Sequence, residues 1–170
     1  MDASEPAMTV DDSGALSEVV VRELIARQLT IGTAESLTGG LVCAALTDVP
    51  GASATVRGAV VSYAVEVKAR VLGVDPALLA QRGAVDPDVA VAMAQGAARV
   101  LGADLAVATT GVAGPSPIDG APVGTVYVAV AWAMGASTVR EFHFTGSRAQ
   151  IRVATVAGAL ALVRQVLASD

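Results

Sequence analysis

One buried strand decides the fold class: Leu105-Ala106-Val107-Ala108-Thr109, followed by Thr110 and the loop Gly111–Pro115. The stretch is almost continuously apolar, which is typical of a strand covered by helices on both faces rather than of a strand with one solvated face. A helical pattern precedes it, starting at Asp86-Pro87 and ending at Gly102. A buried strand next to a helix favours an α/β protein.

Similar short apolar stretches alternate with helical patterns on both sides. We expect further strands at residues 29–34, 56–63, 123–132 and 137–144. We expect helices at about residues 13–28, 38–47, 65–72, 76–81 and 86–102, and a last one after the capping box that begins at Ser147. Interleaved helices and strands predict a three-layer α/β/α sandwich, and the two adjacent strands after residue 122 make its sheet mixed, though mostly parallel.

The length and composition fit one domain. The chain has 170 residues, a formal net charge of −5, and 54% hydrophobic residues. Residues 1–13 contain four acids (Asp2, Glu5, Asp11 and Asp12) and lack apolar periodicity, so we interpret them as a flexible acidic tail. Residues 14–170 then form a single domain.

Several classes of partner are disfavoured. The acidic balance and the few aromatic residues do not suit direct nucleic-acid binding. One cysteine (Cys43) and one histidine (His143) supply no disulfide and no zinc site, so we expect neither metal nor cofactor. Residues 120–139 carry no charge but are rich in β-branched residues, which predicts two strands rather than a membrane span. We expect a soluble, cytoplasmic protein, and its apolar composition suggests a homodimer or higher homo-oligomer.

Ser36 is the candidate nucleophile, because it lies at a strand-to-helix junction. Ligands of open α/β sheets collect beyond the carboxyl ends of strands, where Tyr63 and Thr110 also lie. A serine before a helix is also a common N-cap, which remains the structural alternative. For a nucleophile at this position, free N–H groups at the helix start could hold an oxyanion: those of Thr38, Gly39 and Gly40.

Two kinds of cation frame this candidate site. Lys68 is the only lysine, and only a lysine can lose its proton to act as a neutral base, a step favoured by its place in the first turn of a predicted helix. A solvated surface lysine is the alternative. Arg148, with Arg152 four residues on, suits a phosphate or carboxylate, the alternative being two solvated arginines. His143, between two phenylalanines on a strand, points away from them and reads as structural or solvent-facing.

These residues lie within motifs in a fixed order along the chain: Thr33–Gly40, Ser62-Tyr63 with Lys68, Leu72–Val74, Gly83–Val85, Thr110–Pro115, Pro122–Val126 and Gly146–Arg148. Together they resemble the C-terminal domain of the competence-damage-inducible CinA family, whose members include stand-alone nicotinamide mononucleotide deamidases. The resemblance covers about residues 15–168.

The resemblance implies an amidohydrolase that converts nicotinamide mononucleotide to nicotinic acid mononucleotide and ammonia without a metal. It implies Ser36 as the nucleophile, Lys68 as the general base and Tyr63 as a partner that orients this pair or the substrate. The implied contacts with the nucleotide are Thr110, the loop from Gly111 to Gly114, and Arg148 for the phosphate.

Three positions depart from the family pattern. Val65 stands where asparagine is common, Leu37 stands where cysteine is frequent, and Ser116–Gly120 replaces a glycine-rich loop. A non-catalytic nucleotide-binding module of the same fold is therefore an alternative. A partner protein in DNA uptake or repair is another, suggested by the family name alone.

Overall fold

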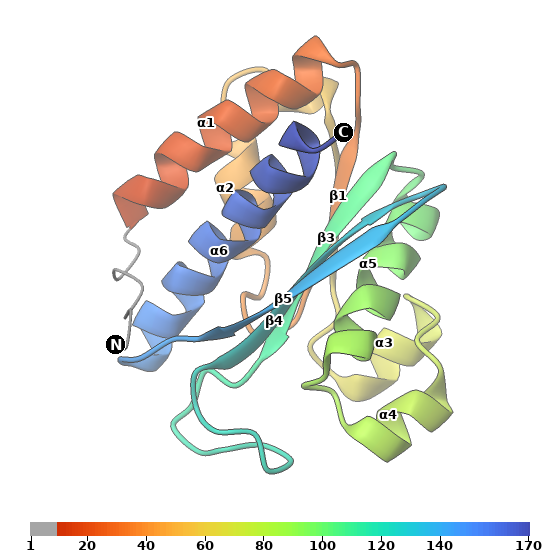
Figure 1. Cartoon of the computed structure of the whole chain (residues 1–170), viewed down its shortest axis with the longest axis vertical. Helices are drawn as coiled ribbons and strands as arrows, with labels where there is room; N and C mark the ends of the chain where they lie inside the picture. The colour runs from red at the N-terminus through yellow and green to blue at the C-terminus, as the bar shows by residue number, and fades with distance from the viewer. Residues whose placement is uncertain (1–9) are drawn as a thin grey trace.

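Five strands form one sheet at the centre of the computed structural model, which describes residues 10–170 (Figure 1). In chain order they are β1 (Ile31–Glu35), β2 (Val56–Val61), β3 (Leu105–Gly111), β4 (Thr125–Trp132) and β5 (Ser137–His143). Their spatial order is β2-β1-β3-β4-β5. β1 pairs in parallel with β2 and β3, whereas β4 runs antiparallel to β3 and β5. The expected mixed sheet is confirmed.

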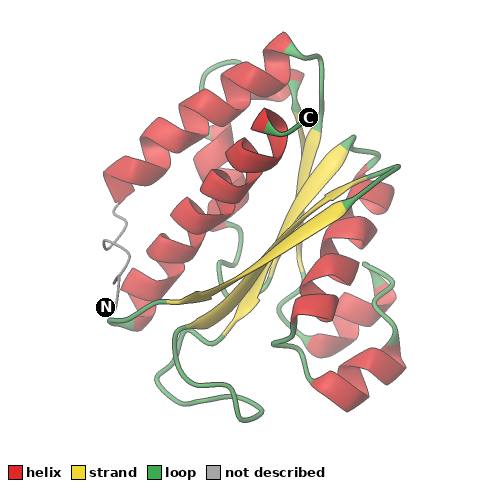
Figure 2. Ribbon diagram, viewed as in Figure 1, coloured by secondary structure: helices red, strands yellow, loops and turns green. Residues whose placement is uncertain are grey.

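Helices cover both faces of this sheet (Figure 2). One face carries α1 (Val10–Ala26), α2 (Leu41–Thr47) and α6 (Arg148–Ala168). The other carries α3 (Val65–Arg70), α4 (Pro76–Arg82) and α5 (Pro87–Leu101). A 3-10 turn, η1 (Ala52–Ala54), precedes β2. The predicted three-layer α/β/α sandwich is therefore confirmed.

The two faces of the sheet differ in side-chain size. Along β3, Leu105 and Val107 pack in the core beneath α1 and α6, whereas Ala106 and Ala108 pack in the core beneath α5. The alternation follows from the two-residue period of a strand. Alanine on the second face lets the alanine-rich α5 approach the sheet closely, so both faces of β3 are buried, as its sequence predicts.

Two predicted boundaries are wrong. α1 begins at Val10, so residues 10–13 of the expected tail are helical, while residues 1–9 lie outside the described part of the chain. Apolar periodicity marks only the turns of α1 that pack on its neighbours, α6 and α2, and the first turn of a helix can precede it. α2 begins at Leu41 rather than at residue 38, because Gly39 and Gly40 adopt φ angles of 59° and 104° that continue no α-helix.

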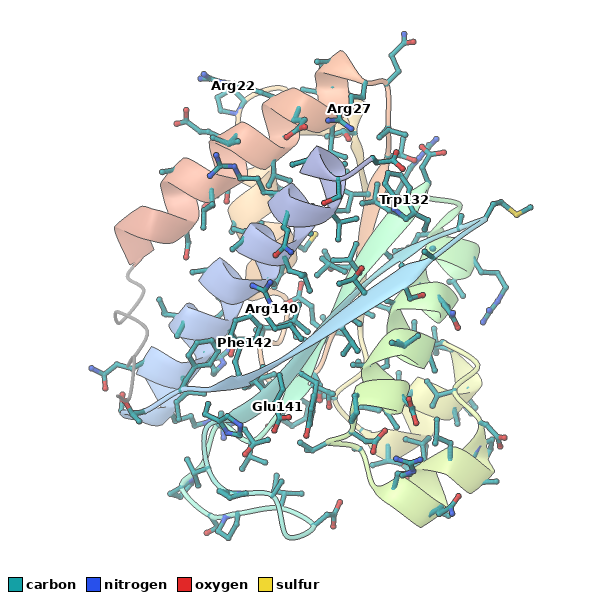
Figure 3. The ribbon with its side chains drawn as sticks, in the orientation of Figure 1. Arg22, Arg27, Trp132, Arg140, Glu141 and Phe142 are labelled. Atoms are coloured by element: carbon teal, nitrogen blue, oxygen red, sulfur yellow. The ribbon has the colours of Figure 1, made fainter. Side chains whose placement is uncertain are left out.

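The only histidine of the sequence, His143, lies at the end of β5, the strand at one edge of the sheet. Arg140 and Phe142 face α6, where Arg140 donates to Gln165 and Phe142 stacks on Phe144 with ring centroids 5.2 Å apart (Figure 3). His143 lies on the opposite, exposed face and pairs with Glu141 (Nε2 to Oε1, 3.1 Å). The expectation that His143 points away from the phenylalanines is confirmed.

The charge-free stretch 120–139 forms β4, the turn after it and the start of β5, as expected. Within residues 10–170, α6 is the only helix long and apolar enough to cross a membrane. Most of it is buried, against α1 and the sheet, which is the packing of a core helix.

Candidate functional site

A cleft of about 210 Å³ opens where the chain leaves the carboxyl ends of β1, β2 and β3. It brings together most of the residues proposed from the sequence: Ser36, Tyr63, Lys68, Thr110, Gly111, Gly114 and Arg148. The cleft is also lined by Val65 and by residues of the loops 111–114 and 116–120, Ala113, Ile118 and Asp119. Sequence reasoning did not assign three further lining residues to it: Leu37, Ala84 and Val85. The strand order explains why these residues lie together: β1 lies between β2 and β3, and all three strands are parallel, so their carboxyl ends are adjacent.

Ser36 and Lys68 are in direct contact at the base of the cleft. The Lys68 Nζ donates to Ser36 Oγ at 3.1 Å and to the carbonyl oxygen of Ser62 at 2.6 Å. Only 1% of the Lys68 surface is exposed. The alternative of a solvated surface lysine is therefore wrong.

Burial also changes the proton affinity of this amine. It lowers the pKa of Lys68 from 10.5 to about 8. No carboxylate among the described side chains, those of residues 13–170, forms an ion pair with its Nζ, so no negative charge offsets the loss of hydration. From the sequence, we expect the dipole at a helix N-terminus to lower this pKa. However, α3 has only six residues and Lys68 lies in its last turn. Desolvation is the cause.

The loop that carries Ser36 is held from below by a buried carboxylate. Glu35 ends β1, is fully buried, and accepts hydrogen bonds from the backbone N–H groups of Gly40, Val42 and Cys43. Its Oε1 also accepts from the Thr33 hydroxyl at 3.0 Å. The carboxylate thus caps α2 from outside the helix and fixes the chain immediately before Ser36.

This cap occupies groups that the sequence assigned to substrate. The Gly40 N–H donates to Glu35 and the Gly39 N–H donates to the Ser36 carbonyl, so the prediction that these two groups hold an oxyanion is wrong, whereas the Thr38 N–H donates to no described residue. Thr38 is buried and shares a hydrogen bond with the hydroxyl of Thr109. None of Thr38, Gly39 and Gly40 lines the cleft.

Arg152 holds the same loop from the side of α6. Its Nε donates to the Leu37 carbonyl at 2.8 Å and its Nη2 donates to the Thr38 carbonyl at 3.1 Å. The fork of the guanidinium therefore spans two successive peptide groups. Arg152 does not line the cleft, which contradicts both the shared anion pocket and the pair of solvated arginines expected from the sequence.

Arg148 instead lies on the rim. It donates to the Tyr63 hydroxyl at 3.0 Å and to the Gly114 carbonyl at 2.6 Å. Tyr63 is 62% exposed, and its hydroxyl bonds neither Ser36 nor Lys68 in the described part of the chain. Opposite, the Thr110 hydroxyl donates to the Ala84 carbonyl at 2.6 Å and so joins β3 to the segment before α5.

A tight hairpin forms the remaining rim. Ile118 and Ala121 exchange two backbone hydrogen bonds around Asp119-Gly120, whose φ angles are 49° and 80°. An Asp-Gly pair with both φ angles positive is the sequence preferred in two-residue hairpin turns. The Asp119 side chain lies against Gly83, where an added Cβ would be 2.8 Å from Oδ2.

Two further cavities among the described residues show no comparable chemistry. One lies beside Cys43 and Arg57, and another beside Asp104 and Trp132. Among the side chains of residues 13–170, no three His, Cys, Asp or Glu gather in a group that could bind a metal.

Comparison with known proteins agrees with this architecture. Residues 13–167 match the family model of the CinA C-terminal domain. A CinA-like protein of Frankia casuarinae is 52% identical over 158 residues, which are 93% of this chain and 36% of that protein. A CinA-like protein of Mycobacterium tuberculosis is 47% identical over 158 residues, 92% of this chain and 36% of that protein. The chain thus spans little more than a third of these relatives.

Solved structures match over nearly their whole length. A CinA superfamily protein from Klebsiella pneumoniae is 35% identical with a TM-score of 0.89, covering 93% of this chain and 99% of that one. The competence/damage inducible protein CihA from Agrobacterium tumefaciens is 36% identical with a TM-score of 0.88, covering 91% of this chain and 95% of that one. With the family model matching nearly all of residues 10–170, the chain belongs to the CinA C-terminal domain family.

Proposed function

We propose that this domain is a serine amidohydrolase that converts nicotinamide mononucleotide to nicotinic acid mononucleotide and ammonia. One observation carries the proposal: a buried lysine with a pKa of about 8 lies 3.1 Å from the hydroxyl of Ser36 at the base of a cleft. A serine next to a base within hydrogen-bond distance is the arrangement that nucleophilic catalysis requires. The choice of substrate rests on the family resemblance of the separated motifs.

The lowered pKa supplies the base. At pH 7.5 a lysine with a pKa of 8 is neutral in about one molecule in four, against about one in a thousand at 10.5. The neutral amine of Lys68 accepts the Ser36 proton as Oγ attacks the carboxamide carbon. The protonated amine then returns that proton to the leaving nitrogen, the carbon–nitrogen bond breaks, and ammonia departs. Water, deprotonated by the same amine, hydrolyses the acyl-serine to the carboxylate.

The oxyanion requires a donor, and we assign it to the backbone N–H of Leu37. Leu37 lines the cleft next to Ser36, and its N–H has no acceptor among residues 10–170. The N–H of Ser36 itself donates to the Thr109 carbonyl and is not free. A backbone donor fixed before the reaction costs no reorganisation when negative charge develops on the carbonyl oxygen.

The rim supplies the nucleotide contacts in this proposal. Arg148 contacts the phosphate, and Thr110 and the backbone from Gly111 to Gly114 form the wall against which the ring and ribose lie. Tyr63 orients Arg148 through its hydroxyl, so it acts on the substrate rather than on the Ser36–Lys68 pair. We place the reaction in the cytoplasm, and the homo-oligomer expected from the sequence stays a prediction.

Ammonia release from nicotinamide mononucleotide, in the presence of a chelator, tests the proposal. Ser36→Ala, Lys68→Arg and Lys68→Met should each abolish release, whereas Ser53→Ala, at an exposed serine, should leave it unchanged. Folding of every variant is checked by thermal unfolding. The wild-type rate should also rise with pH through about 8, because the active amine is the neutral one.

Two outcomes would contradict the proposal. Turnover that survives in Ser36→Ala would exclude Ser36 as the nucleophile. A folded wild type that binds the nucleotide without releasing ammonia would indicate the alternative, a binding module, and would direct attention to Val65 in the cleft wall.

A further inference from the structure

The rim of the cleft carries two charged side chains that no opposite charge neutralises. The guanidinium of Arg148 donates only to neutral oxygens, the Tyr63 hydroxyl and the Gly114 carbonyl. The carboxylate of Asp119 takes part in no hydrogen bond or ion pair with the described side chains or backbone of residues 13–170. Both side chains line the cleft, yet they do not pair with each other. The cleft therefore offers one free positive charge and one free negative charge at separate places.

The backbone holds the negative charge in place. Asp119 occupies the first central position of the hairpin turn, and both central residues have positive φ angles, which Asp and Gly tolerate. Gly83 provides the space that the Asp119 side chain occupies, since a Cβ there would collide with it. The turn therefore places the Asp119 side chain in the wall of the cleft, against Gly83.

We propose that Asp119 is a specificity-determining residue, which selects a ligand with a positive charge on the ring that bears the reacting amide. This inference rests on the proposed function. The oxidised pyridine nucleotide carries both kinds of charge. Its cationic ring matches the free carboxylate of Asp119, and its anionic phosphate matches the free guanidinium of Arg148. The reduced, dihydropyridine nucleotide keeps the phosphate but has a neutral ring. Asp119 therefore discriminates between the two redox forms, whereas Arg148 does not.

Crossed variants and ligands test this assignment. Asp119→Asn removes the charge but keeps a residue that tolerates positive φ, and Arg148→Gln removes the opposite charge. Asp48→Asn, at an exposed position outside the cleft, is the control for net charge. Affinity is measured by calorimetry on Ser36→Ala protein, so that no turnover occurs, with nicotinamide mononucleotide, its reduced form and nicotinamide riboside.

Each variant should weaken the affinity only for ligands that carry the charge opposite to the side chain removed. Asp119→Asn should weaken the two ligands with a cationic ring by roughly fivefold and leave the reduced nucleotide unchanged. Arg148→Gln should weaken the two phosphorylated ligands and spare the riboside. The Asp119 effect should shrink as salt rises, since the residue is exposed. Asp48→Asn should change none of the affinities.

The assignment would be overturned if Asp119→Asn weakened the binding of the oxidised and reduced nucleotides equally, or weakened neither. Failure of the wild type to bind the oxidised nucleotide would also overturn it. Failure of the proposed function has a different signature. Selective binding without ammonia release by the wild type would leave the role of Asp119 standing and exclude the amidase.

Discussion

Two loops border the same cleft, and they are held in opposite ways. The nucleophile loop, Ser36–Gly40, is fixed by the buried carboxylate of Glu35 on one side and by the guanidinium of Arg152 on the other. The rim loop, Ser116–Gly120, is exposed, and its backbone is tied mainly by the two hydrogen bonds between Ile118 and Ala121.

Under the proposed function, this difference separates the chemistry from the recognition of the ligand. The Ser36–Lys68 pair depends on buried polar groups that hold backbone atoms, so a substitution there also perturbs the core. The rim carries its charge on a segment that contributes little to the core and can change at small cost in stability. Perturbing the nucleophile loop should therefore cost stability and turnover, whereas perturbing the rim loop should change affinity. Four substitutions test this contrast.

Glu35→Gln should have the largest effect. The substitution places an amide donor among three N–H donors and a hydroxyl, in a fully buried site. We expect a loss of about 3 kcal/mol or more in the free energy of unfolding, measured by urea denaturation. Glu66→Gln, at an exposed position, should stay within about 0.5 kcal/mol of wild type. A loss below about 1 kcal/mol for Glu35→Gln would show that the cap is dispensable.

Lys68→Met should reveal the buried amine as a pH-dependent term in stability. Below about pH 7 nearly all molecules, folded and unfolded, hold the Lys68 proton, so the difference in stability between wild type and variant is constant there. Between about pH 8 and 10.5 the folded state has lost this proton while the unfolded state keeps it, so the wild type gains stability relative to the variant, by up to about 3 kcal/mol. Urea denaturation from pH 7 to 10.5 measures this; a flat difference would contradict the lowered pKa.

Arg152→Lys should lower kcat about tenfold and change KM little. A lysine cannot span the carbonyls of Leu37 and Thr38, so the loop and Ser36 lose their position relative to Lys68. Arg164→Lys, exposed on the same helix, is the matched control and should be neutral. A raised KM with kcat intact would instead place Arg152 in ligand binding, as its spacing from Arg148 suggested.

Gly120→Ala should have the smallest effect, and it tests the rim. Gly120 has φ 80° with open space around its Cα, and Gly102, far from the cleft, has φ 59° with equally open space. Alanine at either position should cost about 1 kcal/mol of stability through backbone strain. Only Gly120→Ala should change KM, because it tilts the hairpin that carries Asp119. Equal KM values for the two variants would show that the rim loop takes no part in recognition of the ligand.

Sequence reasoning predicted the fold and the meeting of several candidate site residues from two different signals. The double-sided burial of β3 follows from its continuous apolar residues, and the meeting of Ser36 with Tyr63 and Thr110 follows from parallel strand ends. The predicted start of α2 at residue 38 is wrong. Residues 38–40 resemble a helix start in sequence, but Gly39 and Gly40 adopt positive φ angles in the folded protein.

The groups that hold the nucleophile loop carry no comparable signal. Glu35 and Arg152 bind backbone N–H and carbonyl groups, which every residue has, so no pattern of side chains marks the partners. Their roles are therefore visible only in three dimensions. Asp119 lies in a loop without periodicity, although the Asp119-Gly120 pair could have predicted the hairpin turn.

The position of α6 in the chain has a consequence for biosynthesis. Arg148 and Arg152 both come from this helix, which follows every other element of the site in sequence. During synthesis from the N-terminus, the sheet and the Ser36–Lys68 pair emerge first, but the nucleophile loop lacks its clamp and the rim lacks its guanidinium until α6 has been made and has docked. A ribosome-bound chain that ends before residue 148 therefore lacks the contacts of both arginines, which form only when this one helix docks.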